Sequence, residues 1–334
     1  MHQTLIKSIK HSRILLSPLN WGLGHVSRTI PIIQWLLANE NEVIICCDES
    51  QERFYRNYFP EIWYVPHEGY PFKFKGNGNW TLDIIKNFRD LHLFLQDEKR
   101  RVKDLVEKFN PDLIISDQRF GFISKKVKSV IISHQVNLPV SDWNLLAKMW
   151  NRKLLSKFNE IWIPDTIEQE FSGKLSNGNL RNKHFIGTCS RFKNVLKENS
   201  TSKVKQYKYL GIISGPAPYN KQLLDLFINK MEQSNQKSAV IIPEELYDES
   251  LNSELITAIS SPSHGEFTEL LLESKIVISR AGYSTLMDLI ETKNEGILIP
   301  TPGQAEQEYL SEFHENNKSW VFKTEEEFLK MELS

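Results

Sequence analysis

Short apolar runs alternate with longer amphipathic stretches along the first half of the chain. Apolar runs of this length between helical patterns are typical of parallel strands that are buried on both faces of a sheet. We therefore predict an α/β fold with a doubly wound sheet. The predicted strands are 13–17, 42–47, 61–65, 112–116, 129–133 and 160–163, and the clearest helical patterns are 30–37 and 91–109.

The alternation pauses over residues 172–206, which are rich in Asn, Lys, Ser and Gly apart from a short apolar island at 184–187. A second series of apolar runs follows, at 209–214, 238–242, 275–279, 296–299 and 320–323. Single cores rarely grow past roughly 250–300 residues, so a chain of 334 residues favours two domains. We predict two Rossmann-like domains, 1–185 and 186–334, which face each other across a ligand-binding cleft.

Composition narrows the class of protein. Lys and Arg number 41 and Asp and Glu 42, which argues against a dedicated nucleic-acid binder. The three cysteines form no C-x-x-C pair, as expected for reduced thiols in the cytoplasm. No apolar stretch approaches the roughly 18 residues that span a bilayer. We expect a cytoplasmic protein, with the inner membrane face as a possible place of peripheral contact.

A glycine-containing loop joins the first predicted strand to the following helix. Gly22 and Gly24 allow the backbone to approach a ligand, and the start of the helix favours anions. His25 lies at this helix start, where it either acts as a base or merely caps the helix. Arg28 shares its helical face. A dinucleotide site fits less well, because Ser27 stands where the third glycine of that fingerprint would be.

Ionisable and amide side chains also follow two later strands of the first domain. Asp117 and Arg119 come directly after one buried strand, and His134 and Gln135 follow the next. Because parallel strands end at one edge of a sheet, we expect these groups near His25. A carboxylate beside a histidine orients it and stabilises its imidazolium, so Asp117 is the expected partner of a catalytic base.

The most specific motif lies in the second domain. A predicted strand ends in Ser279 and Arg280, a turn of small residues follows, and hydroxyl side chains begin a helix. Such a helix start suits a diphosphate. Ser284 and Asp288 share a face of the helix, where an acid can bind ribose hydroxyls. A Gln-rich segment at 304–307 opens the next helix, close to where a sugar would lie.

These segments resemble the MurG-like GT-B glycosyltransferases of glycosyltransferase family 28. The resemblance implies a GT-B fold, a nucleotide-sugar donor and no cofactor. It covers most of the chain in layout but only these segments in motif. This sequence has Asp288 where the family usually has Glu, Asn20-Trp21 in the first loop, and Gly-Pro-Ala-Pro in the phosphate loop at 215–218. These departures leave the donor sugar open.

The residues and the resemblance together give two sets of candidate ligands. The acceptor-side set is Gly22, Gly24, Arg28, Arg119, His134 and Gln135. The donor-binding set is Ser214, Gly215, Arg280, Ala281, Gly282, Ser284, Thr285, Asp288, Gln304, Glu306 and Gln307.

The expected reaction is a metal-independent, inverting transfer from a UDP-linked sugar to a hydroxyl acceptor, with His25 as base and Asp117 as its partner. The chain contains no Asp-x-Asp and no cluster with metal-ligand spacing. Arg280 and the helix start at 282–285 are expected to stabilise the departing diphosphate. Two alternatives stay open: a MurG-related nucleotide-sugar hydrolase, whose Gly-His-Val/Ile-x-Arg stretch is similar to Gly24–Arg28, and a non-catalytic nucleotide-sugar binder.

One further segment, 143–157, has a helical pattern with four cations and no acid. Trp143, Leu146, Met149 and Trp150 recur near three- and four-residue spacings. Basic amphipathic helices with Trp can lie in a lipid interface, which would suit a lipid-linked acceptor. The alternative is that this apolar stripe packs on its own sheet.

Overall fold

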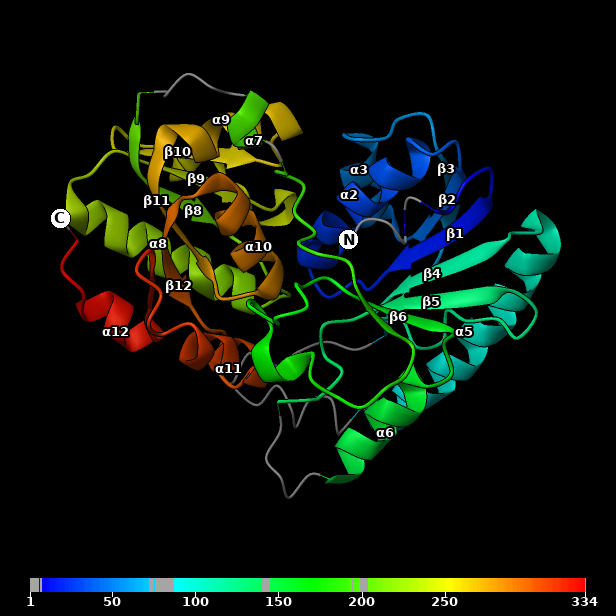
Figure 1. Ribbon diagram of the computed structural model, residues 1–334. Coiled ribbons are helices and arrows are strands. Elements are labelled where there is room, and N and C mark those ends of the chain that lie inside the picture. The colour runs from blue at the N-terminus through cyan, green and yellow to red at the C-terminus, as the bar shows by residue number, and fades with distance from the viewer. Residues whose placement is uncertain are drawn as a thin grey trace. The chain divides into compact units, whose positions relative to one another are not determined.

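The computed structural model describes Ile6, 8–71, Lys75, 87–139, 145–193, 195–198 and 204–333. These residues form two compact units: the first ends at Arg191, and the second consists of the chain from Phe192 onward together with Lys75. Most of the glycine-rich and aromatic stretch at 69–80, which the sequence suggests is a long loop, lies outside the described residues. Each unit is an α/β sandwich around one parallel sheet (Figure 1).

The described part of the first unit holds a seven-stranded parallel sheet in the order β3-β2-β1-β4-β5-β6-β7. Its strands are β1 Arg13–Pro18, β2 Glu42–Cys47, β3 Trp63–Pro66, β4 Leu113–Asp117, β5 Lys128–Ile132, β6 Glu160–Ile163 and β7 Lys183–Phe185. The predicted parallel sheet is confirmed. The sequence prediction missed β7, because this edge strand has only three residues, all half-buried.

Helices cover both faces of this sheet, and the alternation of side chains along β1 shows how. Leu16 packs in one cluster with Val26 and Ile30, whereas the preceding Leu15 packs in another with Val102. Successive strand residues point to opposite faces, so both faces are buried and the strand reads as a continuous apolar run. In the part of this unit that the structure describes, the helices are α2 Leu23–Leu37, α3 Glu49–Arg56, α5 Phe88–Phe109 and α6 Leu145–Leu155.

The described part of the second unit holds a six-stranded parallel sheet in the order β10-β9-β8-β11-β12-β13. Its strands are β8 Tyr207–Ile212, β9 Ser238–Ile242, β10 Ile256–Ser260, β11 Ser274–Arg280, β12 Glu295–Ile299 and β13 Trp320–Phe322. Its helices are α7 Val195–Glu198, α8 Tyr219–Ser234, α9 His264–Glu273, α10 Tyr283–Thr292, α11 Ala305–Phe313 and α12 Glu325–Lys330. The sequence prediction missed β10, an edge strand that is only partly buried.

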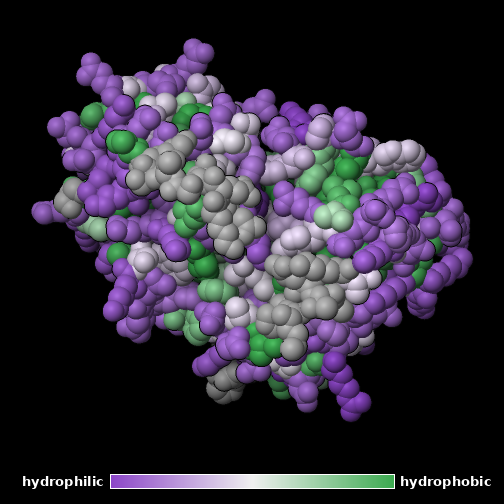
Figure 2. Space-filling view, turned by 45° about the horizontal axis from the view of Figure 1, so that its top comes forward, coloured by the Kyte–Doolittle hydropathy of each residue, from purple (hydrophilic) through white to green (hydrophobic). Residues whose placement is uncertain are grey.

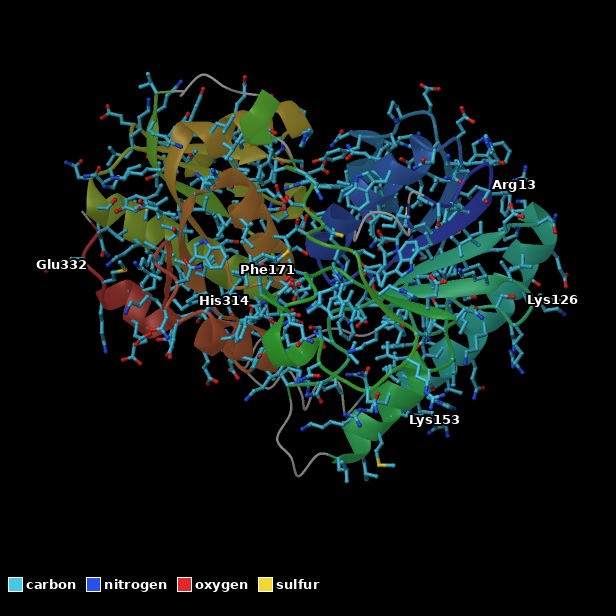
Figure 3. The ribbon with its side chains drawn as sticks, in the orientation of Figure 1. Arg13, Lys126, Lys153, Phe171, His314 and Glu332 are labelled. Carbon is cyan, nitrogen blue, oxygen red and sulfur yellow. The ribbon has the colours of Figure 1, made fainter. Side chains whose placement is uncertain are left out.

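Each sheet reverses its strand order at one point, between β1 and β4 in the first unit and between β8 and β11 in the second. In open α/β sheets, ligands bind beyond the carboxyl ends of the strands at such a switch point. The loop with Gly22 and Gly24 follows β1, and the turn at Gly282 follows β11. Both predicted sites therefore lie at switch points. Arg13 and Lys126 mark the opposite edge of the first sheet, where strands begin (Figure 3).

Candidate active site

The first half-site begins with the loop after β1. Gly22 precedes α2 with a φ of 94°, in the left-handed region that glycine adopts without a steric penalty. This turn starts the helix at Leu23 and brings His25 into its first turn. The His25 side chain is 18% exposed, so it is the accessible member of the polar group described next.

Four sequence-predicted residues meet at the switch point of the first sheet. His25 Nδ1 lies 2.8 Å from Asp117 Oδ2. Arg28 donates from Nε and Nη2 to the other oxygen, Asp117 Oδ1, at 2.9 and 2.5 Å. Arg28 Nη1 lies 3.2 Å from His134 Nδ1. Asp117 has no exposed side-chain surface and Arg28 only 3%, so the pair is buried behind the histidine.

Charge keeps Asp117 ionised in this buried position. Burial raises the pKa of its carboxyl group, but the guanidinium of Arg28 and the imidazole of His25 together hold that pKa below its ordinary value. His25 Nδ1 lies 2.8 Å both from Asp117 Oδ2 and from Arg28 Nη2. Arg28 Nη2 also donates to Asp117 Oδ1, whereas an ionised carboxylate only accepts hydrogen bonds, so we assign the proton on His25 Nδ1 to the bond with Asp117. The basic lone pair of His25 is then on Nε2, the arrangement that a general base requires.

Arg119 does not join this group, contrary to the sequence expectation. Gln118 has a φ of 57°, a left-handed turn that separates the directions of Asp117 and Arg119. The Arg119 side chain is fully buried, and its Nε lies 2.6 Å from Glu98 Oε1. Arg119 is therefore an internal cation, and an acceptor cannot reach its side chain. Gln135 follows β5, and its backbone carbonyl accepts a hydrogen bond from Asn151 Nδ2 at 3.0 Å.

The second half-site lies where β8 and β11 end. Gly215, in the loop after β8, has a φ of 100°, and no atom lies within 4 Å of the position a Cβ would take. The loop contains a cis peptide bond between Ala217 and Pro218. Gly282 precedes α10, and no side chain caps that helix. The backbone N–H groups at the start of a helix point along its axis and can receive an anion such as a diphosphate.

Arg280, predicted as a phosphate ligand, lies inside the unit and is only 2% exposed. Its Nη2 donates to Tyr219 O at 3.0 Å, and its Nη1 lies 3.4 Å from Pro300 O and 2.8 Å from Glu325 Oε1. The reason is that β11 continues to Arg280, which keeps this side chain in the sheet's packing rather than in the turn. Arg280 thus connects the starts of α8 and α12 with the end of β12.

The remaining donor candidates differ in how they are placed. Ser284 and Asp288 are half-buried on one face of α10, as the spacing predicts. Gln304 and Glu306 are half-buried at the start of α11. Gln307, by contrast, is buried and accepts from Thr301 N at 2.8 Å, so it stabilises its own loop. Ala281 is buried, whereas Ser214 and Thr285 are half-buried.

Several residues around these half-sites escaped the sequence prediction. Glu98 and His67 form a buried group with Arg119, and Glu325 pairs with Arg280. No local pattern distinguishes Glu98 from the other charges of α5, since its partner comes from a distant strand end. Among the described residues, no group of three or more His, Cys, Asp or Glu is arranged to hold a metal ion. In the same part of the chain, no helix combines the length and apolarity needed to cross a bilayer.

A known protein family matches part of the second unit. Residues 194–330 match the profile of the glycosyltransferase family 28 C-terminal domain. The second unit is thus similar in sequence to a glycosyltransferase family 28 C-terminal domain. This match includes the turn after β11, α10 and the start of α11, where the predicted donor residues lie. No curated protein matches the chain by sequence.

Solved structures establish the fold of the whole chain. The glycotransferase of kitacinnamycin has a TM-score of 0.63 at 11% identity, over 95% of this chain and 87% of its own. UGT89C1 of Arabidopsis thaliana, complexed with UDP-L-rhamnose, has a TM-score of 0.61 at 13% identity, over 95% and 86%. Spinosyn rhamnosyltransferase SpnG, complexed with thymidine diphosphate, has a TM-score of 0.59 at 12% identity, over 95% and 90%.

The predicted GT-B architecture, with two Rossmann-like domains, is confirmed by this likeness. The family 28 domain and the fold together support a nucleotide-sugar-dependent glycosyltransferase.

Proposed function

We propose that this glycosyltransferase is metal-independent and inverting, and that it moves a sugar from a UDP-linked donor to a hydroxyl group of its acceptor. The observation that carries the proposal is the 2.8 Å contact between His25 Nδ1 and Asp117 Oδ2 at the switch point of the first unit. A buried, ionised carboxylate behind a partly exposed imidazole is the arrangement of a general base.

The second unit supports a nucleoside diphosphate as the donor's leaving group. The N-cap residue of α10 is Gly282, which has no side chain to cover the start of the helix, and the space at Gly215 leaves room for phosphate oxygens. Two of the similar structures contain a pyrimidine nucleotide, UDP-L-rhamnose in one and thymidine diphosphate in the other. We therefore favour a pyrimidine nucleotide and assign Asp288 to the ribose and Ser284 to the diphosphate.

In the proposed reaction the acceptor hydroxyl transfers its proton to His25 Nε2 as its oxygen attacks the anomeric carbon. The bond between that carbon and the diphosphate oxygen breaks on the opposite face, so the configuration inverts. Asp117 stabilises the imidazolium that forms. The start of α10 stabilises the charge that develops on the diphosphate. If water took the place of the acceptor, the same groups would perform hydrolysis.

The acceptor side includes an exposed apolar and basic face on α6. Leu145, Leu146 and Met149 are 61, 80 and 57% exposed, and Arg152 and Lys153 beside them are exposed cations. Figure 3 marks Lys153 on this helix. Figure 2 shows that, on one face of the molecule, hydrophobic residues form separate patches on a largely hydrophilic surface. We propose that α6 contacts an anionic lipid surface, at the inner membrane face, and that the acceptor is lipid-linked.

Donor screening tests the proposed function most directly. The full chain is incubated with UDP-, GDP- and dTDP-sugars in the presence of EDTA, and thermal shift, release of the nucleotide and the anomeric configuration of the product are measured. We expect stabilisation by UDP and its sugars, and turnover that EDTA leaves unchanged. A strict requirement for Mg²⁺ or Mn²⁺, or a product with retained configuration, would contradict the mechanism. Release of free sugar at the same rate with every acceptor would favour the hydrolase.

A further inference from the structure

A second group of histidine, carboxylate and arginine lies at the same edge of the first sheet. His67 follows β3, and its Nε2 lies 3.2 Å from Oε1 of Glu98 on α5. Arg119 donates from Nε to the same oxygen at 2.6 Å. The side chains of Glu98 and Arg119 have no exposed surface, and that of His67 has 2%. Because a substrate cannot reach these side chains, any part that they play in catalysis is indirect.

The turn that ends β4 links this group to the proposed catalytic pair. Asp117 points to His25, and Arg119, two residues later, points to Glu98. Ser116 fastens the turn, because its Oγ donates to Arg119 O at 2.6 Å and accepts from Arg119 N at 3.0 Å. A displacement of Arg119 is therefore transmitted to Asp117 over one short, hydrogen-bonded turn.

Arg119 also holds the neighbouring loops. Its Nη2 donates to Glu68 O at 2.5 Å, and its Nη1 lies 3.5 Å from Pro18 O. The next residue along the chain from Pro18, Leu19, donates from its backbone N to Asp117 O at 3.0 Å. Pro18 ends β1, and Leu19 begins the loop that carries Gly22 and leads to His25. The Arg119 guanidinium thus contacts Pro18, next to the loop that leads to His25. The backbone turn between Asp117 and Arg119 connects the same side chain to Asp117.

Glu98 is the counter-charge that keeps Arg119 in this position. Burial raises the pKa of Glu98, but the hydrogen bond from His67 and the cation of Arg119 hold it below its ordinary value. Burial also lowers the pKa of His67, so that this histidine is neutral near pH 7. The group therefore holds one negative and one positive charge. Its packing is tight, since a Cβ on Gly121 would lie 2.3 Å from Glu98 Oε2.

We propose that Glu98 and Arg119 are positioning residues for His25 and Asp117, and that they hold the turn after β4 in place as a buried pair without net charge. The inference rests on the proposed function only in naming His25 as the base. It concerns residues that never touch the substrate.

The test follows His25 itself rather than turnover. The full chain, labelled with ¹⁵N in its nine histidines, is titrated by NMR, and the His25 signals are identified with His25→Gln. Asp117 and Arg28 face the His25 ring directly, with His134 beyond Arg28. We expect wild-type His25 to be neutral with its proton on Nδ1 near pH 7. This readout needs no donor or acceptor.

Glu98→Gln keeps the shape of the side chain but leaves Arg119 as an uncompensated buried cation, because a guanidinium does not lose its proton. A nearby positive charge disfavours the imidazolium, so the pKa of His25 should fall by several tenths of a unit or more. The Nδ1-protonated tautomer should also lose population as the turn loosens. Glu98→Gln/Arg119→Gln removes both charges, so the pKa should return toward that of the wild type while the tautomer stays mixed.

Glu107→Gln is the matched control, since Glu107 lies on the same helix with 55% of its side chain exposed. It should leave both readouts unchanged. If Glu98→Gln does not fold, the double variant, which has no lone buried charge, carries the test through the tautomer. A wild-type pKa and tautomer of His25 in these variants would overturn the inference. Turnover of UDP-sugars by the wild type and its loss in His25→Ala test the proposed function separately.

Discussion

Arg280 and Glu325 form an ion pair, with Arg280 Nη1 2.8 Å from Glu325 Oε1, that links the end of β11 to the first residue of α12. Arg280 also donates to the carbonyl oxygen of Tyr219, where α8 begins. One cation therefore holds together two helix starts and a strand end of the second unit. We propose that its part in donor binding is to position these segments, because its own guanidinium is buried.

The first prediction concerns this cation. Arg280→Ala should weaken UDP binding by at least tenfold and also lower the free energy of unfolding by about 1–3 kcal/mol, because buried carbonyl groups lose their donor. Calorimetry with UDP and chemical denaturation measure the two effects. Glu325→Gln should weaken UDP binding less, since it keeps a hydrogen-bond acceptor. Unchanged UDP affinity in Arg280→Ala would remove this residue from the donor site.

The second prediction concerns the base. His25→Ala should reduce turnover by about 10²–10⁴-fold, the usual contribution of general-base catalysis, and leave UDP affinity unchanged. Steady-state kinetics and calorimetry measure these two quantities. His92→Ala on α5 is the control, because His92 is exposed and its ring contacts Gln96 within the same helix. Equal loss of activity in both variants would point to a general effect of removing a histidine.

The third prediction concerns pH. The pKa of Asp117 is lower in the folded protein than its ordinary value, so its charge stabilises the fold above about pH 4, and this stabilisation disappears as the pH falls through the folded-state pKa. Asp117→Asn should therefore be less stable than the wild type at pH 7, and the difference should shrink toward pH 3. Urea denaturation across this range measures it. A difference that stays constant with pH would contradict the assignment of an ionised Asp117.

The fourth prediction concerns α6. The full chain should co-sediment with anionic vesicles at low salt, and Lys148→Glu/Arg152→Glu/Lys153→Glu should abolish this binding. The matched control is Lys103→Glu/Lys108→Glu/Lys126→Glu, which makes the same change of charge at exposed positions away from α6. If the wild type stays in the supernatant, or the α6 variant binds as well as the wild type, α6 is ordinary scaffold and a soluble acceptor is favoured.

Strands that are buried on both faces could be predicted from the sequence almost to the residue. β2 and β6 begin and end where their apolar runs do, because every position after the first faces a covering helix. The edge strands β7 and β10 could not be found in this way. They are short or half-exposed, so their pairing with a neighbouring strand, rather than their own pattern, makes them strands.

The candidate site residues also differ in how well the sequence predicts their place in the structure. The meeting of His25 with Asp117 followed from strand ends alone, since β1 and β4 are neighbours at the switch point. The burial of Arg119 and Arg280 could not be foreseen, because their carboxylate partners, Glu98 and Glu325, lie far away in sequence on other elements. A strand-end arginine looks the same in sequence whether it binds a substrate or an internal carboxylate. Only the packing of the chain separates these two roles.

The separate switch points have an evolutionary consequence. The residues assigned to the base come from the sheet of the first unit, and those assigned to the nucleotide come from the sheet of the second, with a division between Arg191 and Phe192. We expect substitutions in one set to leave the backbone of the other in place, because the two sheets share no strand. Acceptor choice and donor choice can then change independently in the course of evolution.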